Sequence, residues 1–174
     1  LAGKPALGHA IEHDPDGFEH VLMIGGPGVM VQGICAVGAV DSNDRWKNVE
    51  AAVQRFQDRI PLADAHERTA ILACYGPSLV DTIETLRAEA AKPNVDVISV
   101  SGAHDFLLSH GIVPRYHIEC DPRPHKADNI DKFHPDVSYL IASVVHEVYF
   151  DKLVADGASV KLWHVATGEH TLRI

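Results

Sequence analysis

The chain has 174 residues, 46% of them hydrophobic and 22% charged, and a formal net charge of -9 at pH 7. This length supports one sizeable core, or one core with a small appendage. The acidic balance and the lack of a basic stripe exclude a nucleic-acid surface, and no apolar run is long enough to span a bilayer. We therefore expect neither nucleic acid nor a membrane as a partner.

The three cysteines are an odd number, lie far apart and form no CxxC pair. A reduced, cytoplasmic protein is the simplest explanation. The first residue is Leu1, and no basic region precedes an apolar stretch as in a signal peptide. We expect the chain to be a fragment or a processed form.

The N-terminal part, residues 1–41, predicts a small β appendage. Ala6–Glu12 and Phe18–Ile24 are rich in apolar residues and flank Asp14–Gly17, whose residues favour a turn. This pattern is typical of a β-hairpin. Val29–Val40 has the composition of one or two further strands.

Residues 42–68 predict an amphipathic helix followed by a linker. Asp41 or Ser42 can cap the helix, and Pro61 with the polar residues after it ends the segment. The apolar positions recur at helical spacing, which indicates a face that packs on a sheet or on a partner. These positions are Trp46, Val49, Val53 and Phe56.

In residues 69–174, strand and helix signals alternate. Five short apolar runs separated by helical patterns predict a Rossmann-like parallel sheet of about five strands, with helices on both faces. The expected strands are Thr69–Ala73, Val95–Val100, Tyr116–Cys120, Tyr139–Ala142 and Val160–Trp163. The expected helices lie at Leu79–Ala90, Ala103–His110, Arg123–Phe133 (a turn and a short helix) and His146–Ala155.

Gly76, Pro77 and Ser78 join the first of these strands to its helix. The N–H groups at a helix start lack internal partners and carry partial positive charge, so a phosphate can bind there. We expect Ser78 to cap this helix, with Asp81 as a weak capping-box partner. An ordinary structural turn remains the alternative.

Ligands of parallel sheets bind outside the carboxyl ends of the strands. This rule gives the set of candidate substrate-binding and phosphate-binding residues. They are Gly76, Pro77, Ser78, Ser101, Gly102, Arg123, Ser143 and His146.

His117, Glu119 and Asp121 alternate along one strand, so their side chains are expected on one face. For His117 a structural role is the stronger interpretation. Asp121 stands at the strand end before Pro122, where a carboxylate can hold Mg²⁺ against phosphates or accept a ribose hydroxyl. We expect Asp121 to be a catalytic or metal-binding residue, and Arg123 to bind phosphate through a bidentate contact.

His164 follows the last expected strand and is a candidate acid or base, although a structural role is equally compatible with its position. His146 and Glu147 lack the second histidine of a zinc-protease motif. Mg²⁺ is therefore the one cofactor that we expect.

An ordered set of motifs resembles one known family. It comprises Ala70-Ile-Leu-Ala-Cys-Tyr-Gly-Pro-Ser-Leu79, Val97-Ile-Ser-Val-Ser-Gly-Ala-His-Asp-Phe-Leu107, Gly111-Ile-Val-Pro114 and Tyr116-His-Ile-Glu-Cys-Asp-Pro-Arg123. These motifs resemble the family that joins the archaeal 6-hydroxymethylpterin diphosphokinases to the bacterial motility accessory factor glycosylation proteins. The resemblance covers about residues 43–164, and the Gly-Pro-Ser-Leu turn looks like the nucleotide-phosphate loop of CMP-sialic-acid transferases.

The resemblance implies a Rossmann-like domain and a nucleotide or diphosphate substrate, with Gly76, Pro77 and Ser78 at the phosphates and Asp121 near metal or ribose. Two departures stand out. This chain has Ser101 where the family often has Asn or Asp, and it stops at Ile174, where relatives continue with a further helix and strand. The resemblance therefore also implies C-terminal truncation.

Three functions follow from these observations. The first is a transferase that moves a diphosphoryl or glycosyl group. The second is a dehydrogenase that uses NAD or NADP, but Val31 stands where a glycine fingerprint starting at Gly26 and Gly28 needs its third glycine. The third is a binding or assembly module without catalysis. We also expect a homodimer, formed through an edge or face of the sheet that the chain leaves bare.

Overall fold

The computed structural model describes residues 9–13, 19–23, 40–61 and 65–164. The chain divides into two compact units, residues 1–44 and 45–174. In the first unit, β1 (His9–His13) and β2 (Glu19–Met23) pair antiparallel, as the expected hairpin requires. Its turn, and nearly all of the strand region expected at Val29–Val40, lie outside the described residues.

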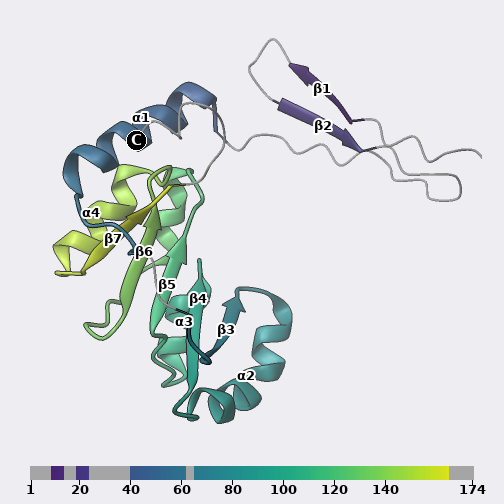
Figure 1. Ribbon diagram of the computed structural model, residues 1–174, viewed down its shortest axis with the longest axis vertical. Helices are drawn as coiled ribbons and strands as arrows, with labels where there is room; N and C mark the ends of the chain where they lie inside the picture. The colour runs from purple at the N-terminus through teal and green to yellow at the C-terminus, as the bar shows by residue number, and fades with distance from the viewer. Residues whose placement is uncertain (1–8, 14–18, 24–39, 62–64, 165–174) are drawn as a thin grey trace, which may run out of the picture. The chain divides into compact units, whose positions relative to one another are not determined.

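The second unit contains a five-stranded sheet in which every neighbouring pair is parallel (Figure 1). Its apolar, β-branched runs follow the expected strands closely. The strands are β3 (Thr69–Cys74), β4 (Val95–Val100), β5 (Tyr116–Glu119), β6 (Ser138–Ala142) and β7 (Val160–Trp163).

Helices alternate with these strands, so the α/β class is confirmed. They are α1 (Ser42–Arg55), α2 (Pro77–Ala90), α3 (Ala103–Ser109), the 3₁₀ helix η1 (Pro124–Asn129) and α4 (Glu147–Ala155). No helix in the described part of the chain is long and apolar enough to cross a membrane.

The strand order is β3-β4-β5-β6-β7, the same as the order in the sequence. A doubly wound Rossmann sheet instead reverses its strand order, and the crevice at that reversal holds the ligand. The described strands contain no such reversal. The candidate site therefore depends on the strand ends themselves and not on a switch point.

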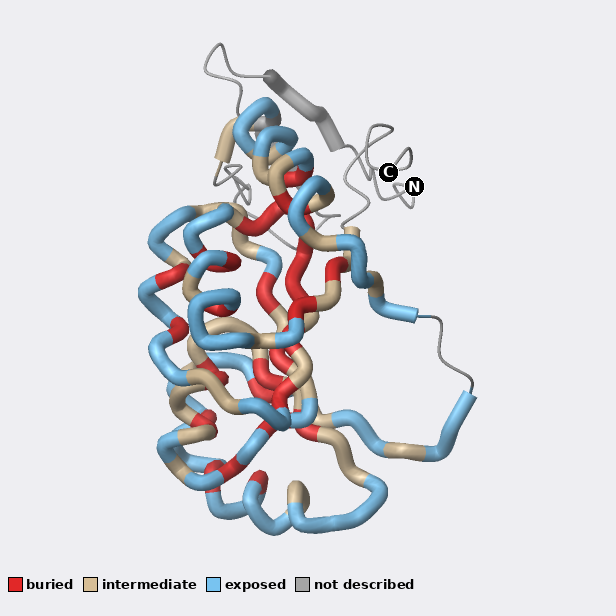
Figure 2. Tube along the Cα trace, turned by 90° about the vertical axis from the view of Figure 1, so that its left-hand side faces the viewer, coloured by how far each residue is buried: buried red, intermediate tan, exposed pale blue. Residues whose placement is uncertain are grey.

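The expectation of helices on both faces of the sheet is wrong for the described helices. Crossovers between parallel strands are right-handed, so a sheet wound steadily in one direction places its helices on one face. The core confirms this arrangement: odd-numbered side chains of β3 and β4 pack on α2 and α3, whereas odd-numbered side chains of β6 and even-numbered side chains of β7 pack on α4 and η1. Figure 2 shows buried residues running through the middle of the fold.

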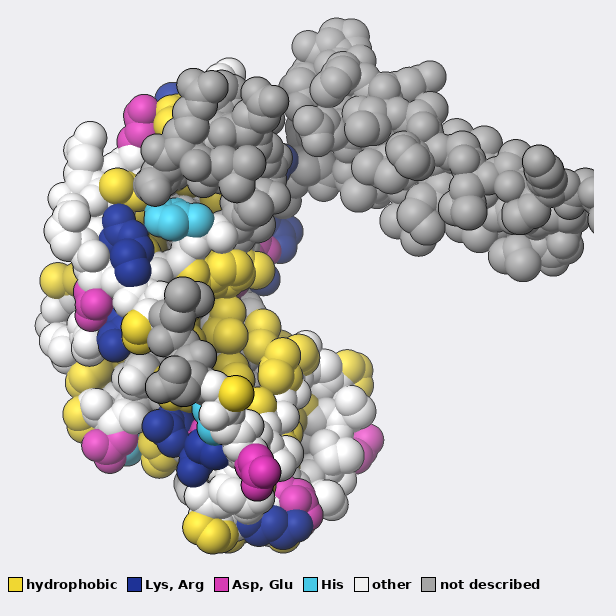
Figure 3. Space-filling model, in the orientation of Figure 1, with side chains coloured by type: hydrophobic (Ala, Val, Ile, Leu, Met, Phe, Trp, Pro, Cys, Tyr) yellow, Lys and Arg dark blue, Asp and Glu magenta, His cyan; other side chains and the backbone are white. Residues whose placement is uncertain are grey.

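The opposite face of the sheet carries the even-numbered side chains of β3 to β6 and the odd-numbered side chains of β7, and several of these are apolar and exposed. Leu72 is 60% exposed, and Cys74 and Cys120 are exposed. Figure 3 shows hydrophobic side chains gathered over the middle of the sheet. All-parallel sheets are normally covered on both faces, whereas the described helices of this unit cover only one.

Large aromatic side chains at the end of α1 and on β7 make contacts within the chain. Phe56 stacks on Phe150 of α4 with ring centroids 4.9 Å apart. Trp163 Nε1 donates to the Leu140 carbonyl at 3.1 Å. Trp46 on α1 is 36% exposed.

Candidate active site

The start of α2 differs from the sequence prediction in one respect. Gly76 is the N-cap residue and Pro77 occupies the first turn, so Ser78 lies inside the helix and makes no side-chain cap. The Leu79 N–H donates to the Gly76 carbonyl at 3.0 Å. The expected capping box of Ser78 and Asp81 is therefore wrong, because the helix begins at Pro77, two residues earlier than a serine cap at position 78 requires.

This helix start still has the properties of an anion site. Ser78 is exposed, and its N–H belongs to the first turn, where no carbonyl of the helix can accept from it. No atom lies within 4 Å of the position that a Cβ would occupy at Gly76. With a φ of -144° this backbone suits any residue, so neither conformation nor packing requires glycine here. The missing side chain keeps the approach to the N-terminus of α2 open.

Tyr75 is a candidate residue that the sequence analysis missed. Its side chain is 69% exposed, and its ring lies 3.2 Å from where a Cβ would stand at Gly102. The ring also meets Phe106 edge-to-face at 6.4 Å. A side chain at position 102 would press against the Tyr75 ring, so glycine fits best there. The signal was present in the sequence, since an aromatic residue directly precedes the Gly-Pro-Ser turn.

Ser101 ends β4 in a left-handed conformation, with a φ of 50°. Non-glycine residues adopt this conformation rarely, and the strain is of order 1 kcal/mol or more. Its N–H donates to the Ile118 carbonyl at 3.1 Å, and its own carbonyl accepts from the His104 N–H. Ser101 and Gly102 thus turn the chain sharply from β4 into α3 at the same sheet end as Gly76.

Glu119 and His117 project to the helix-covered face of β5 and are buried. Glu119 is 3% exposed, and its Oε1 accepts from the backbone N–H groups of Cys120 and Asp121 at 2.8 and 3.0 Å. Its Oε2 is buried without a hydrogen-bond partner in the described part of the chain. Glu119 therefore shapes the strand end that presents Asp121.

Asp121 lies just beyond β5 and is held by two cations. Its carboxylate accepts from the Arg123 backbone N–H at 3.0 Å and from the Arg123 guanidinium at 2.5–3.1 Å, and Lys126 Nζ lies 3.4 Å away. Burial raises the pKa of Asp121, but the bonds from Arg123 and the charge of Lys126 outweigh burial and lower the pKa to about 2. Asp121 is therefore ionised, and the loop carries one net positive charge from these three groups.

The Mg²⁺ expected at Asp121 would need further oxygen ligands around its carboxylate. Among the described residues there is no group of three His, Cys, Asp or Glu side chains placed to hold a metal. Both oxygens of Asp121 already accept from Arg123. The carboxylate therefore does not fit a preformed cation site in this conformation, and Arg123 with Lys126 suits an anion instead.

Ser143 and His164 meet at the ends of β6 and β7. Ser143 Oγ and His164 Nδ1 share a hydrogen bond of 2.8 Å, and the Ser143 N–H donates to the Trp163 carbonyl at 2.9 Å. Ser143 is 1% exposed, so it orients His164 and does not itself face a ligand. Burial, and then the positive charge of Arg59, lower the pKa of His164, which keeps the ring neutral at pH 7.

His146 is the N-cap of α4, and its Nδ1 accepts from the Val148 N–H at 3.3 Å. This contact gives His146 a structural role at the helix start.

Asn48 of α1 is a second residue that the sequence analysis missed. Its amide donates to the Val144 carbonyl at 2.9 Å and to the Pro122 carbonyl at 3.3 Å. Asn48 thereby joins the two loops that carry Asp121 and His146.

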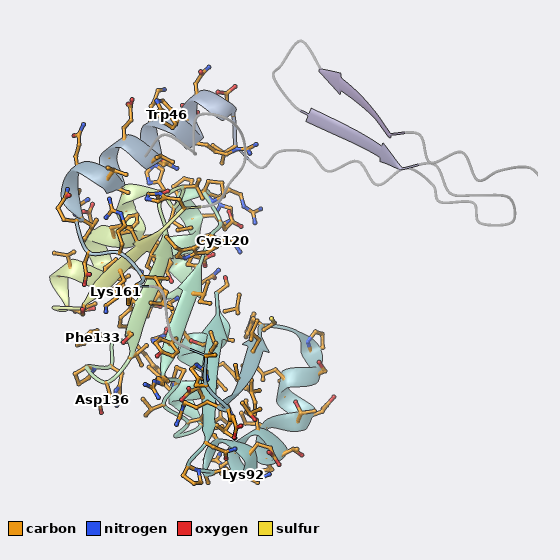
Figure 4. All side chains as sticks on the ribbon, in the orientation of Figure 1. Trp46, Lys92, Cys120, Phe133, Asp136 and Lys161 are labelled. Carbon is orange, nitrogen blue, oxygen red and sulfur yellow. The ribbon has the colours of Figure 1, made fainter. Side chains whose placement is uncertain are left out.

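The carboxyl ends of β3 to β7 carry, in order along the sheet, Gly76, Ser101, Asp121, Ser143 and His164. Figure 4 shows Cys120, next to Asp121, at the end of the sheet near Trp46 of α1, and Lys92 at the opposite end. The carboxyl end thus combines an open helix N-terminus, an exposed tyrosine, an Arg–Lys pair and a neutral histidine.

A family model described as 6-hydroxymethylpterin diphosphokinase MptE-like matches residues 41–161. The chain belongs to this MptE-like family. The match covers more than half of the chain and contains β3 to β6 with their strand ends, whereas His164 lies beyond it. No curated protein and no solved structure matched the chain.

The MptE-like match confirms the family suggested by the sequence motifs. Of the candidate residues, Gly76, Pro77 and Ser78 form a helix start, and Asp121 with Arg123 forms an ion pair. Two of the remaining candidates, Ser143 and His146, make structural contacts within the fold.

Proposed function

We propose that this MptE-like domain binds a nucleotide, or another substrate with a diphosphate, at the carboxyl end of its sheet and transfers a diphosphoryl group. The observation that carries the proposal is the family match over residues 41–161, together with a helix N-terminus that has open space at Gly76. A phosphate group at that terminus would accept from the free N–H of the first turn and lie in the favourable field of the α2 dipole.

The cations at β5 support the same proposal. Arg123 is 40% exposed at its side chain, and Lys126 is 19% exposed. A diphosphate carries more negative charge than the single carboxylate of Asp121 and can compete with it for Arg123. Catalysis then depends on positioning and on neutralising the charge that develops on the phosphate oxygens.

In the proposed reaction, a substrate hydroxyl attacks the β-phosphorus of a nucleoside triphosphate. The bond between the β-phosphorus and the oxygen that bridges to the α-phosphorus breaks, and the nucleoside monophosphate leaves with that oxygen. The hydroxyl proton passes to a base, and the neutral His164 is the candidate for this step. Glycosyl transfer from a nucleotide sugar would use the same phosphate contacts, and this second reaction class remains part of the proposal.

A thermal-shift panel tests the binding step. The nucleotides are CTP, CMP, ATP, GTP, NAD and NADP, each with and without Mg²⁺. A ligand that binds only the folded state stabilises it by about 2.7 kcal/mol at a hundred times its dissociation constant, so at least one nucleotide should raise the Tm clearly. If no nucleotide raises the Tm, the proposed binding site is wrong.

The replacement Gly76→Ala locates the site within the fold. A methyl group at this position meets no atom, so the folded chain should lose no more than about 1 kcal/mol of stability, from the poorer N-cap. Nucleotide affinity should fall by about tenfold or more, because the methyl group narrows the approach to the phosphate position. Equal calorimetric affinities for variant and parent would remove the α2 N-terminus from the site.

The reaction itself is tested by phosphorus NMR with ATP and 6-hydroxymethylpterin, the compound in the family name. Diphosphoryl transfer produces AMP, whereas transfer of one phosphoryl group produces ADP. AMP in equal amounts with a diphosphate ester supports the proposal. If nucleotide binds but no ester forms with or without Mg²⁺, the pterin substrate is wrong.

Mg²⁺ at Asp121 stays a prediction. The Asp121→Asn variant should lose any Mg²⁺ dependence of nucleotide binding, because it lacks the charge that would hold the cation.

A further inference from the structure

The two edge strands of the sheet, β7 and β3, differ in their backbone hydrogen bonding. At β7, residues 58–60 run alongside the strand: the Ile60 N–H donates to the Leu162 carbonyl at 3.2 Å, and the Leu162 N–H donates to the Asp58 carbonyl at 3.0 Å. At β3, on the opposite edge, no strand lies alongside within the residues that the structure describes. Among the described residues, one edge of the sheet is therefore covered and the other, at β3, is bare.

The bare edge of β3 has an ordered set of hydrogen-bonding groups. The Thr69 N–H donates inward to the Asn94 carbonyl at 2.8 Å. Because backbone groups alternate along a strand, the N–H and C=O groups of Ala70, Leu72 and Cys74 point outward. Edge strands usually carry charges or proline that prevent pairing with another chain, but Thr69–Cys74 contains neither.

A groove of about 370 Å³ lies beside this edge, between β3 and α2. Its lining includes Ile71, Ala73, Leu79, Thr82, Thr85 and Leu86. The groove is therefore mainly apolar at its base, with threonines along the side that α2 provides. An added strand at the β3 edge would place its own helix-side residues here.

We propose that β3 pairs antiparallel with β3 of a second copy, across a twofold axis through Leu72. This proposal goes beyond the proposed function and does not depend on it. The outward groups fix the register: Leu72 lies opposite the partner's Leu72, and Ala70 opposite the partner's Cys74. In this register all the outward N–H and C=O groups of the strand find partners, and a shift of two residues leaves some unpaired.

The side chains fit the same symmetry. On the helix side, Ile71 lies opposite the partner's Ala73, so a large residue meets a small one at the groove. Along α2, the exposed stripe places Thr82 opposite the partner's Thr85, and Glu89 near the partner's Ser78. No charged group therefore meets its own copy. A patch that matches itself across a twofold axis favours a second copy over an unrelated extended peptide.

Sedimentation at micromolar concentration tests the dimer. The parent chain should sediment as about twice its 18.9 kDa mass. The Leu72→Lys variant should be monomeric, because two lysines would meet at the axis and the residue already has room at 60% exposure. The matched control is Val113→Lys, which adds the same charge at a residue that is 44% exposed and lies outside β3, and this control should remain dimeric. A monomeric parent, or a dimeric Leu72→Lys variant, would overturn the proposal.

Cysteine cross-linking tests the register and does not depend on a charged variant. In a chain with Cys35, Cys74 and Cys120 replaced by Ser, Leu72→Cys should form an intermolecular disulfide under mild oxidation. Residues in such a hydrogen-bonded antiparallel pair have Cα atoms about 5.5 Å apart, which is within reach of a disulfide. Val113→Cys in the same background should not cross-link. Absence of the Leu72→Cys disulfide in a dimeric chain contradicts this register.

Discussion

His117 is an imidazole that the fold holds without charge. It is fully buried: its Nδ1 shares a 3.1 Å hydrogen bond with Ser99 Oγ, and its Nε2 shares a 2.7 Å hydrogen bond with Tyr149 Oη. The ring of His104 lies edge-on with its centroid 4.7 Å away. Burial, and then the neighbouring His104, lower the pKa of His117 to about 3. A proton on this ring would turn its accepting nitrogen into a donor, so the hydroxyl that donates to that nitrogen would have to accept instead.

The low pKa of His117 predicts acid sensitivity. Between pH 6.5 and about 3 the unfolded chain binds a proton at this residue and the folded chain does not. The free energy of unfolding should therefore fall with acidification by up to about 1.4 kcal/mol per pH unit from this group. Urea unfolding at several pH values should show a smaller slope for His117→Gln than for the parent. Equal slopes would show that His117 does not cause the acid sensitivity.

For several candidate residues the sequence predicted where they lie in the fold, but not which contacts their side chains make. The sequence places Ser78 and His146 at helix starts, yet Gly76 takes the N-cap at the first and His146 itself takes it at the second. Side-chain roles depend on contacts between distant segments. Ser143 is one such case, because its partner His164 lies 21 residues further along the chain.

At the scale of elements, α1 stabilises the site through one side chain. Asn48 donates to carbonyls that follow β5 and β6, while Val49 and Ala52 on the same helix are buried in the core. The sequence predicted the apolar face of this helix from its spacing. It could not predict the polar contact, because the carbonyls of Pro122 and Val144 lie 74 and 96 residues away.

The replacement Asn48→Asp keeps the size of the side chain but removes both donated hydrogen bonds. It also places a carboxylate beside two carbonyl oxygens, so the free energy of unfolding should fall by about 1–3 kcal/mol. Urea unfolding measures this change. The matched control is Asn43→Asp, the same chemical change at an exposed residue in the first turn of α1, where a negative charge is favourable. Similar stability of the two variants would contradict the role of Asn48.

The strands and helices were predictable because each carries its own periodicity. Thr69–Cys74 and Val95–Val100 are short apolar runs, and α2 repeats Leu79, Ile83 and Leu86 at helical spacing. The order of the strands was not predictable in this way. Residues such as Ile98 and Ile118 look the same in the sequence whether a helix covers them or not, so the open face emerges only from the topology.

At the scale of the whole molecule, the family match begins at residue 41, and both core clusters lie after residue 44. The boundary between the two compact units, at residues 44 and 45, falls within the first turn of α1. Asp41 Oδ1 accepts from the Asn43 N–H at 2.6 Å, which satisfies one free donor at the start of this helix. A cut before Asp41 therefore keeps α1 and its cap intact.

We expect residues 41–174 to fold without the N-terminal segment. The sheet, its helices and both core clusters remain, and cooperative unfolding of a domain depends on such a contiguous core. Thermal unfolding followed by circular dichroism should give a single transition with a Tm within about 4 °C of the parent, which for a domain of this size corresponds to about 1 kcal/mol. A broad transition, or a much lower Tm, would show that residues 1–40 are needed to stabilise the MptE-like domain.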